Sequence, residues 1–316
     1  MNNAATNERC TVDTKTPSIL DRLSQKMIFR LLGAMQFGQI VVKDGENRWT
    51  FGSDETLTAY VTIRDPNFYR QVVFGGSIGA GEAYIGHLWD VDDLSVLSRI
   101  MVLNMDLLDR MEHGLGWILQ IFRLLGHVTR HNSRKGSKRN IIAHYDLGNT
   151  LTQYKPFLDP TMMYSAAIYP EESSSLEEAS FHKLETICKK LDLQPTANDN
   201  KYDQYSRSVD FIQRHIFPDG HILSATKMLN LIALKTDMVV RNLEDFGLDY
   251  ARTLRDWRKR FNEAFPSLRE QGYDERFRRV WEYYLCYCEG GFQEQSISVV
   301  HILANRPKNA VDVVGE

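Results

Sequence analysis

The stretch between Gly148 and Gly220 contains no glycine, and this limits what the middle of the chain can form. A loop that brings its backbone against a bound nucleotide, where a strand meets a helix, needs glycine at the point of approach. No run between Leu193 and His215 has the apolar character of a buried parallel strand either. The sequence therefore predicts that the middle of the chain lacks the glycine loop and parallel sheet of a cofactor-binding α/β domain.

A chain of 316 residues is long enough for roughly two domains. Its net charge of −3 provides no general attraction to nucleic acid, so we expect no nucleic-acid partner. The cysteines form no C-x-x-C pair and no histidines stand at zinc spacing, which favours reduced thiols, a cytoplasmic setting and no metal site. The N-terminus lacks an apolar signal core, and the longest apolar stretch, residues 115–125, is too short to span a bilayer.

The sequence pattern predicts a disordered lead (1–17), a small α+β domain that resembles a lipid-binding domain (18–130) and a basic linker (131–140). A mainly helical part (141–305) and a tail (306–316) follow. In the α+β domain, apolar spacings of three and four predict a helix over residues 19–35, with Ser18 as its N-cap. Alternation on both sides of the turn Asp44-Gly45 predicts a β-hairpin whose apolar face holds Ile40, Val42, Trp49 and Phe51.

The glycines at positions 76, 79 and 81 allow two interpretations. A dinucleotide loop requires the order G-x-G-x-x-G and an acidic residue about 20 positions further on, and the spacings here run in the wrong order. We therefore favour a tight glycine turn that leads into a short helix and buries Tyr84, Ile85, Leu88 and Trp89.

An apolar segment, residues 115–125, is followed by a run of basic residues between 130 and 139. Such a pair can lie on an anionic membrane surface, where each basic side chain contributes about 1 kcal/mol. The alternative is a buried helix followed by a solvated linker between domains.

The C-terminal part reads as a series of helices. The best-marked one starts at a capping box formed by Ser175 and Glu178, and Cys188 in its apolar stripe is expected to be a core thiol. Met238-Val239-Val240 could form a lone strand. Further helices are predicted over residues 209–215, 225–232, 250–264 and 275–288, and Gly290-Gly291 is expected to end the last of them.

Several motifs occur in a characteristic order, namely GAGEAYIGHLWDVDDL, HYDLGN, FLDPTMMYSAAIYPEE, SLEEASFHKLETICKKLDLQP, VDFIQRHIFPDG and WEYYLCYCEGGF. In this order they resemble the cyclopropane-fatty-acyl-phospholipid synthases, S-adenosylmethionine-dependent enzymes of the mycolic-acid cyclopropane synthase family. The motifs cover most of residues 20–305, and the segment upstream is similar to the family's N-terminal lipid-binding domain. The resemblance implies transfer of a methyl group from S-adenosylmethionine to a cis double bond of a phospholipid acyl chain. Ring closure then follows by loss of a proton to a bound bicarbonate.

The resemblance also implies roles for particular residues. Tyr164 and Ser165 match the pair that contacts the cofactor, and Tyr145 matches an aromatic residue beside it; an aromatic face stabilises a sulfonium by about 1 kcal/mol. Tyr250 matches the tyrosine that helps to hold bicarbonate, and Cys288 matches the cysteine commonly assigned to the active site. From the residues alone, Cys286 and Cys288 are two small residues on adjoining faces of a helix, where thiols are usually inert.

The chain departs from the family pattern at two places. Ala166 stands where many relatives carry a cysteine of the bicarbonate site, and an internal deletion is expected near residues 195–205, where the strand and glycine-rich turn of the cofactor domain should follow. We therefore predict a mainly α chain with a small α+β N-terminal domain, and a C-terminal remnant of a class I methyltransferase fold without its central sheet.

Two functional hypotheses follow. The first is a cyclopropane synthase by descent that is impaired or inactive alone. The second is a non-catalytic protein that binds phospholipid at the inner face of the membrane, as a homo-oligomer or as the partner of a full-length relative.

Overall fold

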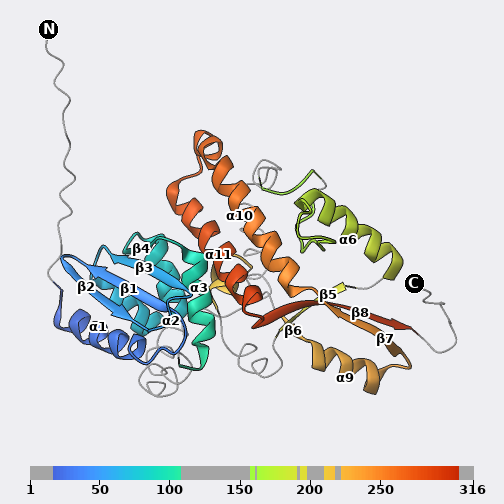
Figure 1. Ribbon diagram of the computed structural model, residues 1–316, viewed down its shortest axis with the longest axis horizontal. Coiled ribbons are helices and arrows are strands. Elements are labelled where there is room, and N and C mark those ends of the chain that lie inside the picture. The colour runs from blue at the N-terminus through green and yellow to red at the C-terminus, as the bar shows by residue number, and fades with distance from the viewer. Residues whose placement is uncertain are drawn as a thin grey trace, which may run out of the picture.

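The computed structural model describes residues 17–107, 157–160, 162–190, 193–197, 210–217 and 222–305. Two sheets lie toward opposite ends of the molecule, with the long helices α10 and α11 between them (Figure 1). Six of the sequence predictions lie outside the described residues: the disordered lead as far as residue 16, the apolar segment 115–125, the basic linker, Tyr145, the burial of the Cys188 side chain and the tail 306–316.

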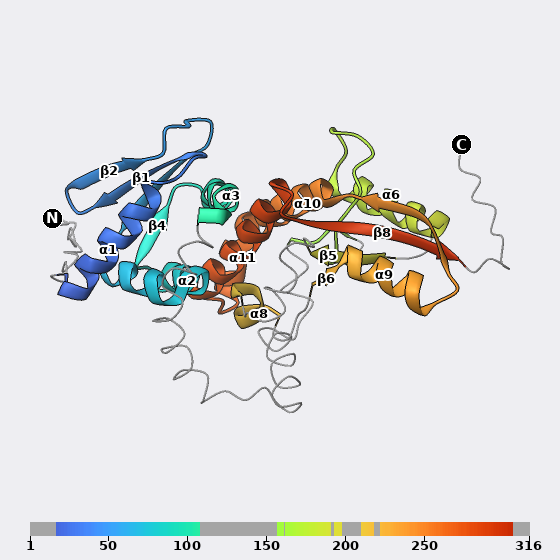
Figure 2. The same cartoon turned by 90° about the horizontal axis from the view of Figure 1, so that it is seen from below.

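The N-terminal part is a four-stranded sheet in the order β2-β1-β3-β4, with helices packed against it (Figure 2). Strands β1 and β3 are parallel and the other pairs are antiparallel. The predicted hairpin is confirmed, because Val42 pairs with Trp49 and Ile40 pairs with Phe51. In chain order the elements are α1 (Ile19–Leu32), β1 (Gln39–Asp44), β2 (Asn47–Phe51), β3 (Thr58–Ile63), α2 (Asn67–Ile85), β4 (Trp89–Val91) and α3 (Leu94–Leu103).

Local caps start the helices where the sequence predicts them. The Ser18 hydroxyl accepts the Asp21 backbone N–H at 3.2 Å, and the Asp21 carboxylate accepts the Ser18 backbone N–H at 3.0 Å. The same reciprocal pair joins Ser175 and Glu178 at the start of α6 (Leu176–Lys190), at 3.2 and 2.8 Å. Each pair satisfies backbone donors that a helix leaves free in its first turn.

The predicted glycine turn before a short helix corresponds to a sharp kink at Gly76, which divides the helical segment into two pieces. Helix α2 runs through the glycine-rich segment from Asn67 to Ile85 and is kinked at Gly76, whose φ of 56° and ψ of −138° suit glycine. At Gly79 a Cβ would come 2.0 Å from the Gln71 carbonyl oxygen, so the kink depends on this glycine as well. The segment follows no strand–loop–helix path, which argues against the dinucleotide interpretation, whereas burial of Tyr84, Ile85 and Trp89 is confirmed.

The C-terminal sheet has the order β6-β5-β8-β7. It is formed by β5 (Leu193–Ala197), β6 (Leu223–Ser224), β7 (Val239–Asp245) and β8 (Ile297–Asn305). Residues 193–197 form a strand that is antiparallel to β8 and, over Thr196 and Ala197, parallel to β6, although the sequence predicted no parallel strand here. A strand does form at Val239 and Val240, but it is the edge strand of this sheet rather than a lone strand. Both strands pair with β8, which lies about 100 residues after β5 and about 60 residues after β7, so composition alone does not reveal these strands. The absence of a central parallel sheet stays a prediction.

A helical hairpin of α10 (Gly247–Glu270) and α11 (Glu275–Gln293) forms the centre of the core, around Trp257, Phe261 and Trp281. Gly290 and Gly291 do not end α11, which continues to Gln293. A Cβ at Gly290 would meet the Ser98 Cβ at 2.9 Å, so this glycine allows α3 to approach closely. The remaining described helices are α8 (Phe211–His215) and α9 (Ala225–Lys235).

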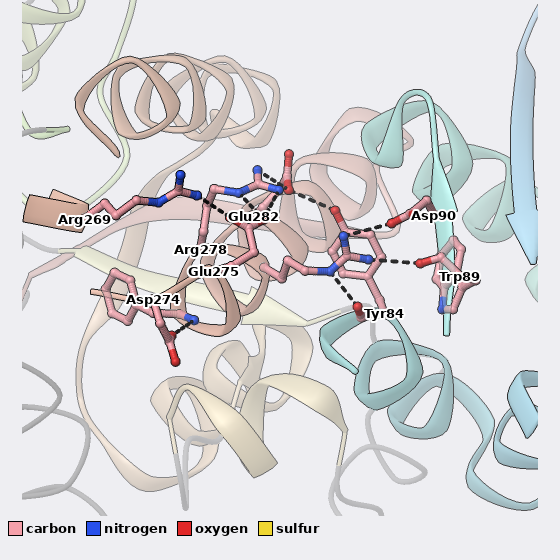
Figure 3. A network of polar contacts seen from close by, with 10 residues as sticks. Tyr84, Trp89, Asp90, Arg269, Asp274, Glu275, Arg278 and Glu282 are labelled. Carbon is pink, nitrogen blue, oxygen red and sulfur yellow. Dashed lines mark hydrogen bonds and ion pairs between the residues drawn. The ribbon is translucent and has the colours of Figure 1, made fainter. Parts of the chain in front are cut away.

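Arg279 of α11 joins the two halves of the chain. Its partners Tyr84, Trp89 and Asp90 are labelled in Figure 3. Its guanidinium donates to the carbonyl oxygens of Tyr84 at 2.6 Å and Trp89 at 2.9 Å, and pairs with the Asp90 carboxylate at 2.9 Å. It also lies 3.7 Å from the centroid of the Tyr84 ring, and the Tyr84 hydroxyl donates to Glu282 at 2.9 Å. A buried charge with this many partners fixes the N-terminal part against α11.

Candidate functional site

The α10–α11 hairpin brings Tyr250 and Cys288 to the same end of the helix pair. Tyr250 lies in the first turn of α10 and Cys288 near the end of α11, and the two helices run in opposite directions. The Tyr250 ring packs on Phe292 at 4.7 Å between centroids and edge-on to Trp257 at 6.1 Å. The predicted pair therefore lies at the open end of the hairpin, away from the turn at residues 271–274, and aromatic packing holds the Tyr250 ring there.

Tyr164 reaches the same place from the segment that precedes α6. Its ring stacks on Trp257 at 5.1 Å with an interplanar angle of 28°, and its hydroxyl lies 3.3 Å from the Tyr284 hydroxyl. The segment is fixed on α10 because the Ala167 backbone N–H donates to the Thr253 hydroxyl at 3.1 Å. Residues more than 80 positions apart thus meet at one site.

Burial keeps this site uncharged. It raises the pKa of Tyr250, with a smaller effect from the Cys288 thiol, and raises the pKa of Tyr284, with smaller effects from Tyr164, Tyr250 and Cys288. The pKa of Cys288 is raised by burial and secondarily by the Asp210 carboxylate, whose own pKa burial also raises. At neutral pH the site offers phenol and thiol groups that are protonated, which disfavours Cys288 as a thiolate nucleophile.

Ser165 has a different environment. Its side chain is exposed, and its hydroxyl accepts a hydrogen bond from the buried ammonium of Lys183 in α6. Burial lowers the pKa of Lys183 to about 8, and the buried Asp159 carboxylate partly opposes this shift. Because an ammonium only donates, the Ser165 proton must point away from Lys183, and the hydroxyl is set as a donor toward solvent.

The structure therefore unites three of the five predicted site residues, Tyr164, Tyr250 and Cys288. Ser165 is paired with Lys183, and Tyr145 lies outside the described residues. Sequence reasoning missed Tyr284, although it precedes Cys288 by four positions in a helix and so shares its face. Lys183 and Asp210 were also missed, because neither position carries a local signal of chemistry.

Side-chain packing covers part of the aromatic surface at this site. One face of the Tyr164 ring is covered by Trp257, and the ring of Tyr250 is packed on Phe292. Two surface cavities of about 550 and 420 Å³ occur in the described ranges, one along the C-terminal half of α10 and one in the N-terminal part. Neither is lined by a predicted site residue. We therefore derive no reaction step through a bound cofactor.

In the part of the chain that the structure describes, no helix is both long and apolar enough to cross a bilayer. Within the same ranges, no group of three or more histidine, cysteine or acidic side chains is arranged to hold a metal ion.

Comparison with known proteins identifies relatives that cover most of the chain. The profile of a family described as mycolic acid cyclopropane synthetase matches residues 132–199 and 196–302. The cyclopropane-fatty-acyl-phospholipid synthase of Escherichia coli (strain K12) is 25% identical over 348 residues, which covers 78% of this chain and 88% of the relative. The tuberculostearic acid methyltransferase UfaA1 of Mycobacterium tuberculosis (strain ATCC 25618 / H37Rv) is 22% identical over 367 residues, covering 78% and 85%.

A solved structure also shows some likeness. The crystal structure of mycolic acid cyclopropane synthase CmaA1 complexed with SAH and CTAB aligns with a TM-score of 0.41 at 17% identity, covering 51% of this chain and 95% of that chain.

Proposed function

Because this chain belongs to the mycolic acid cyclopropane synthetase family, we propose that it descends from a cyclopropane-fatty-acyl-phospholipid synthase and still binds phospholipid. We further propose that it does not hold S-adenosylmethionine unaided and is inactive alone. In this proposal the N-terminal part binds phospholipid at the inner face of the membrane.

The observation that supports this proposal is an interruption within the family match. The matched segments meet at residues 196–199. The alignment with the Escherichia coli enzyme spans 348 positions, yet 78% of a 316-residue chain is about 246 residues, so roughly 100 positions of the alignment have no counterpart here. The interruption at 196–199 falls inside the stretch without glycine. The missing positions are therefore best assigned to the glycine loop and strands that would hold the cofactor.

The retained site fits a role in lining an apolar chain rather than in transferring a group. Tyr164, Tyr250 and Tyr284 present aromatic walls with neutral hydroxyls, and Cys288 stays protonated beside them. Ala166, which is buried, offers no thiol where relatives by resemblance hold bicarbonate, so we do not extend bicarbonate binding to this chain.

Calorimetric titration with S-adenosylmethionine and with S-adenosylhomocysteine tests the loss of cofactor binding. We expect no measurable heat at ligand concentrations up to about 1 mM, since a few aromatic contacts outside an enclosed pocket bind weakly. The Escherichia coli synthase is the positive control. Micromolar binding, or cyclopropane product from labelled cofactor, would sink the proposal.

Phospholipid binding has its own test. The full chain should float with vesicles that contain phosphatidylglycerol, and added salt should weaken the association, because basic side chains near an anionic surface contribute about 1 kcal/mol each. A chain that stays at the bottom of the gradient at low salt would remove this half of the proposal.

A second candidate function is that of a partner subunit, and the C-terminal sheet favours it. Helix α9 has no buried residue, and Leu234 is 78% exposed. Leu231, one turn earlier on α9, and Leu243 on β7, a strand that contacts α9, are also exposed, and exposed apolar side chains that gather in one region mark contact sites. Sedimentation should show either self-association or a complex with a complete synthase. A monomer at all concentrations, with a sharp melt and no effect on a complete synthase, would rule this function out.

A further inference from the structure

A polar cavity lies in the N-terminal part, far in sequence from the site described above. It has a volume of about 420 Å³ and opens between the start of α1, the ends of β1 and β3, and the start of α2. This is within the usual size range of small-ligand sites. Its lining combines both signs of charge with a buried aromatic residue: Pro17, Asp21, Arg22, Gln25, Lys43, Asp44, Gly45, Thr62, Ile63, Arg64, Pro66 and Tyr69.

A closed set of hydrogen bonds shapes the lining. Tyr69 is buried, and its hydroxyl donates to Asp44 Oδ2 at 2.8 Å. The Gln25 side-chain amide donates to the same Asp44 oxygen at 3.2 Å and to the Tyr69 hydroxyl at 3.1 Å. Both bonds to Asp44 use the same oxygen, Oδ2, so its second oxygen is the acceptor left for a ligand, and the carboxylate is held in one orientation.

Three cations surround this carboxylate. Arg22, Lys43 and Arg64 are exposed and line the cavity. Arg64 also pairs with Asp90 at 2.9 Å, whereas Arg22 and Lys43 form no ion pair with any residue that the structure describes. The other acidic lining residue, Asp21, is buried; its Oδ2 belongs to the α1 cap, and its Oδ1 lies 3.8 Å from Arg70 and accepts no hydrogen bond from a described residue. The cavity thus offers the half-buried carboxylate of Asp44 beside two exposed cations, Arg22 and Lys43, that are unpaired among the described residues.

An apolar edge adjoins this cavity on α1. Ile19 is 81% exposed and Leu23, one turn further along, is 53% exposed, with Leu20 also exposed. Arg22 lies between this edge and the cavity on the helix surface. Exposed apolar side chains next to cations are typical of a helix that rests in the headgroup region of a membrane.

We propose that this cavity binds the headgroup of a membrane phospholipid that carries a primary ammonium beside its phosphate, while Ile19, Leu20 and Leu23 enter the membrane interface. Arg22 and Lys43 contact the phosphate, and the free oxygen of Asp44 accepts a hydrogen bond from the ammonium. A trimethylammonium has no N–H to donate, so the site prefers ethanolamine over choline headgroups. This inference rests on the phospholipid binding proposed above and names its site and lipid class.

The test compares vesicles of phosphatidylcholine and phosphatidylglycerol with vesicles in which phosphatidylethanolamine replaces most of the phosphatidylcholine. We expect the full chain to bind the second set about fivefold more tightly, the size of effect typical of one exposed charge-assisted hydrogen bond. Asp44→Asn keeps the shape and an acceptor for Tyr69, and should abolish the preference. Glu46→Gln, which removes a nearby exposed carboxylate of the same hairpin outside the cavity, is the matched control and should retain it.

Two further experiments test whether the cations and the cavity itself account for vesicle binding. Arg22→Gln and Lys43→Gln should weaken binding to both vesicle sets, whereas Arg48→Gln, a control cation on β2, should have a smaller effect. Soluble O-phosphoethanolamine should compete with vesicles better than phosphocholine or inorganic phosphate does. Equal competition by all three would mean that the cavity binds phosphate without recognising the ammonium, and would overturn the proposal.

Failure of this inference and failure of the proposed function give different results. Vesicle binding without an ethanolamine preference, or a preference that survives Asp44→Asn, overturns the headgroup site and leaves phospholipid binding intact. No binding to any vesicle removes the proposed function. In that case calorimetric titration with O-phosphoethanolamine tests whether the cavity binds the headgroup by itself. The absence of heat would overturn the headgroup site as well.

Discussion

Replacing Arg279 with methionine should destabilise the folded chain far more than the same change at the adjacent Arg278. Arg279 is 5% exposed and makes two hydrogen bonds to backbone carbonyls, an ion pair with Asp90 and a contact with the Tyr84 ring. Removal of one partner from such a buried set costs about 3–5 kcal/mol. Asp90 keeps its ion pair with Arg64, so we expect the lower end, about 3 kcal/mol.

Arg278→Met is the matched control. Arg278 forms ion pairs with Glu275 at 2.7 Å and Glu282 at 2.9 Å, one turn away on the same helix and partly open to solvent. Pairs of this kind contribute about 0.3–1 kcal/mol. The two variants differ in sequence by one position, so helix propensity changes equally in both.

Urea unfolding followed by tryptophan fluorescence and circular dichroism measures the difference. We expect a lower midpoint for Arg279→Met with an unchanged slope, or a transition that splits in two if the halves of the chain come apart first. Equal losses of stability for the two variants would refute the inference that Arg279 joins the N-terminal part to α11.

Three further predictions concern packing and ionisation. Gly290→Ala should cost about 1–3 kcal/mol in urea unfolding, because its Cβ would meet Ser98 at 2.9 Å; Gly75→Ala, with open space around its Cβ, should cost nothing, and equal losses would contradict the close helix contact. Iodoacetamide at about pH 8 should modify Cys288 at least tenfold more slowly in the folded than in the unfolded chain, since burial raises its thiol pKa; equal rates by mass spectrometry would show a thiolate. Burial also raises the pKa of Cys286, so the folded chain keeps a proton that the unfolded chain loses above about pH 8.5. The stability due to this neutral thiol is complete below that pH and declines above it by up to about 1.4 kcal/mol per pH unit. Unfolding curves between neutral and alkaline pH should show the decline and Cys286→Ala should reduce it, whereas a profile that Cys286→Ala leaves unchanged would argue against the shift.

The sequence by itself determined the features that depend on neighbours along the chain. The caps at Ser18 and Ser175 and the hairpin around Asp44-Gly45 follow from residues only a few positions apart, and all three are found in the structure. The order of motifs also predicted the family, and part of the site could be found this way, because Tyr164 and Cys288 each lie in a matching motif and Tyr250 matches a tyrosine of the family.

Only the tertiary structure decided which residues meet. Tyr284 joins Tyr164 across 120 positions, Lys183 turns the Ser165 hydroxyl outward, and Gly290 serves a helix contact instead of a helix end. Strand β5 exists because β8 supplies its hydrogen-bonding partner, although its own residues are poor strand formers. Burial, close approach and strand pairing are set by distant segments, so they could not be predicted from the local pattern.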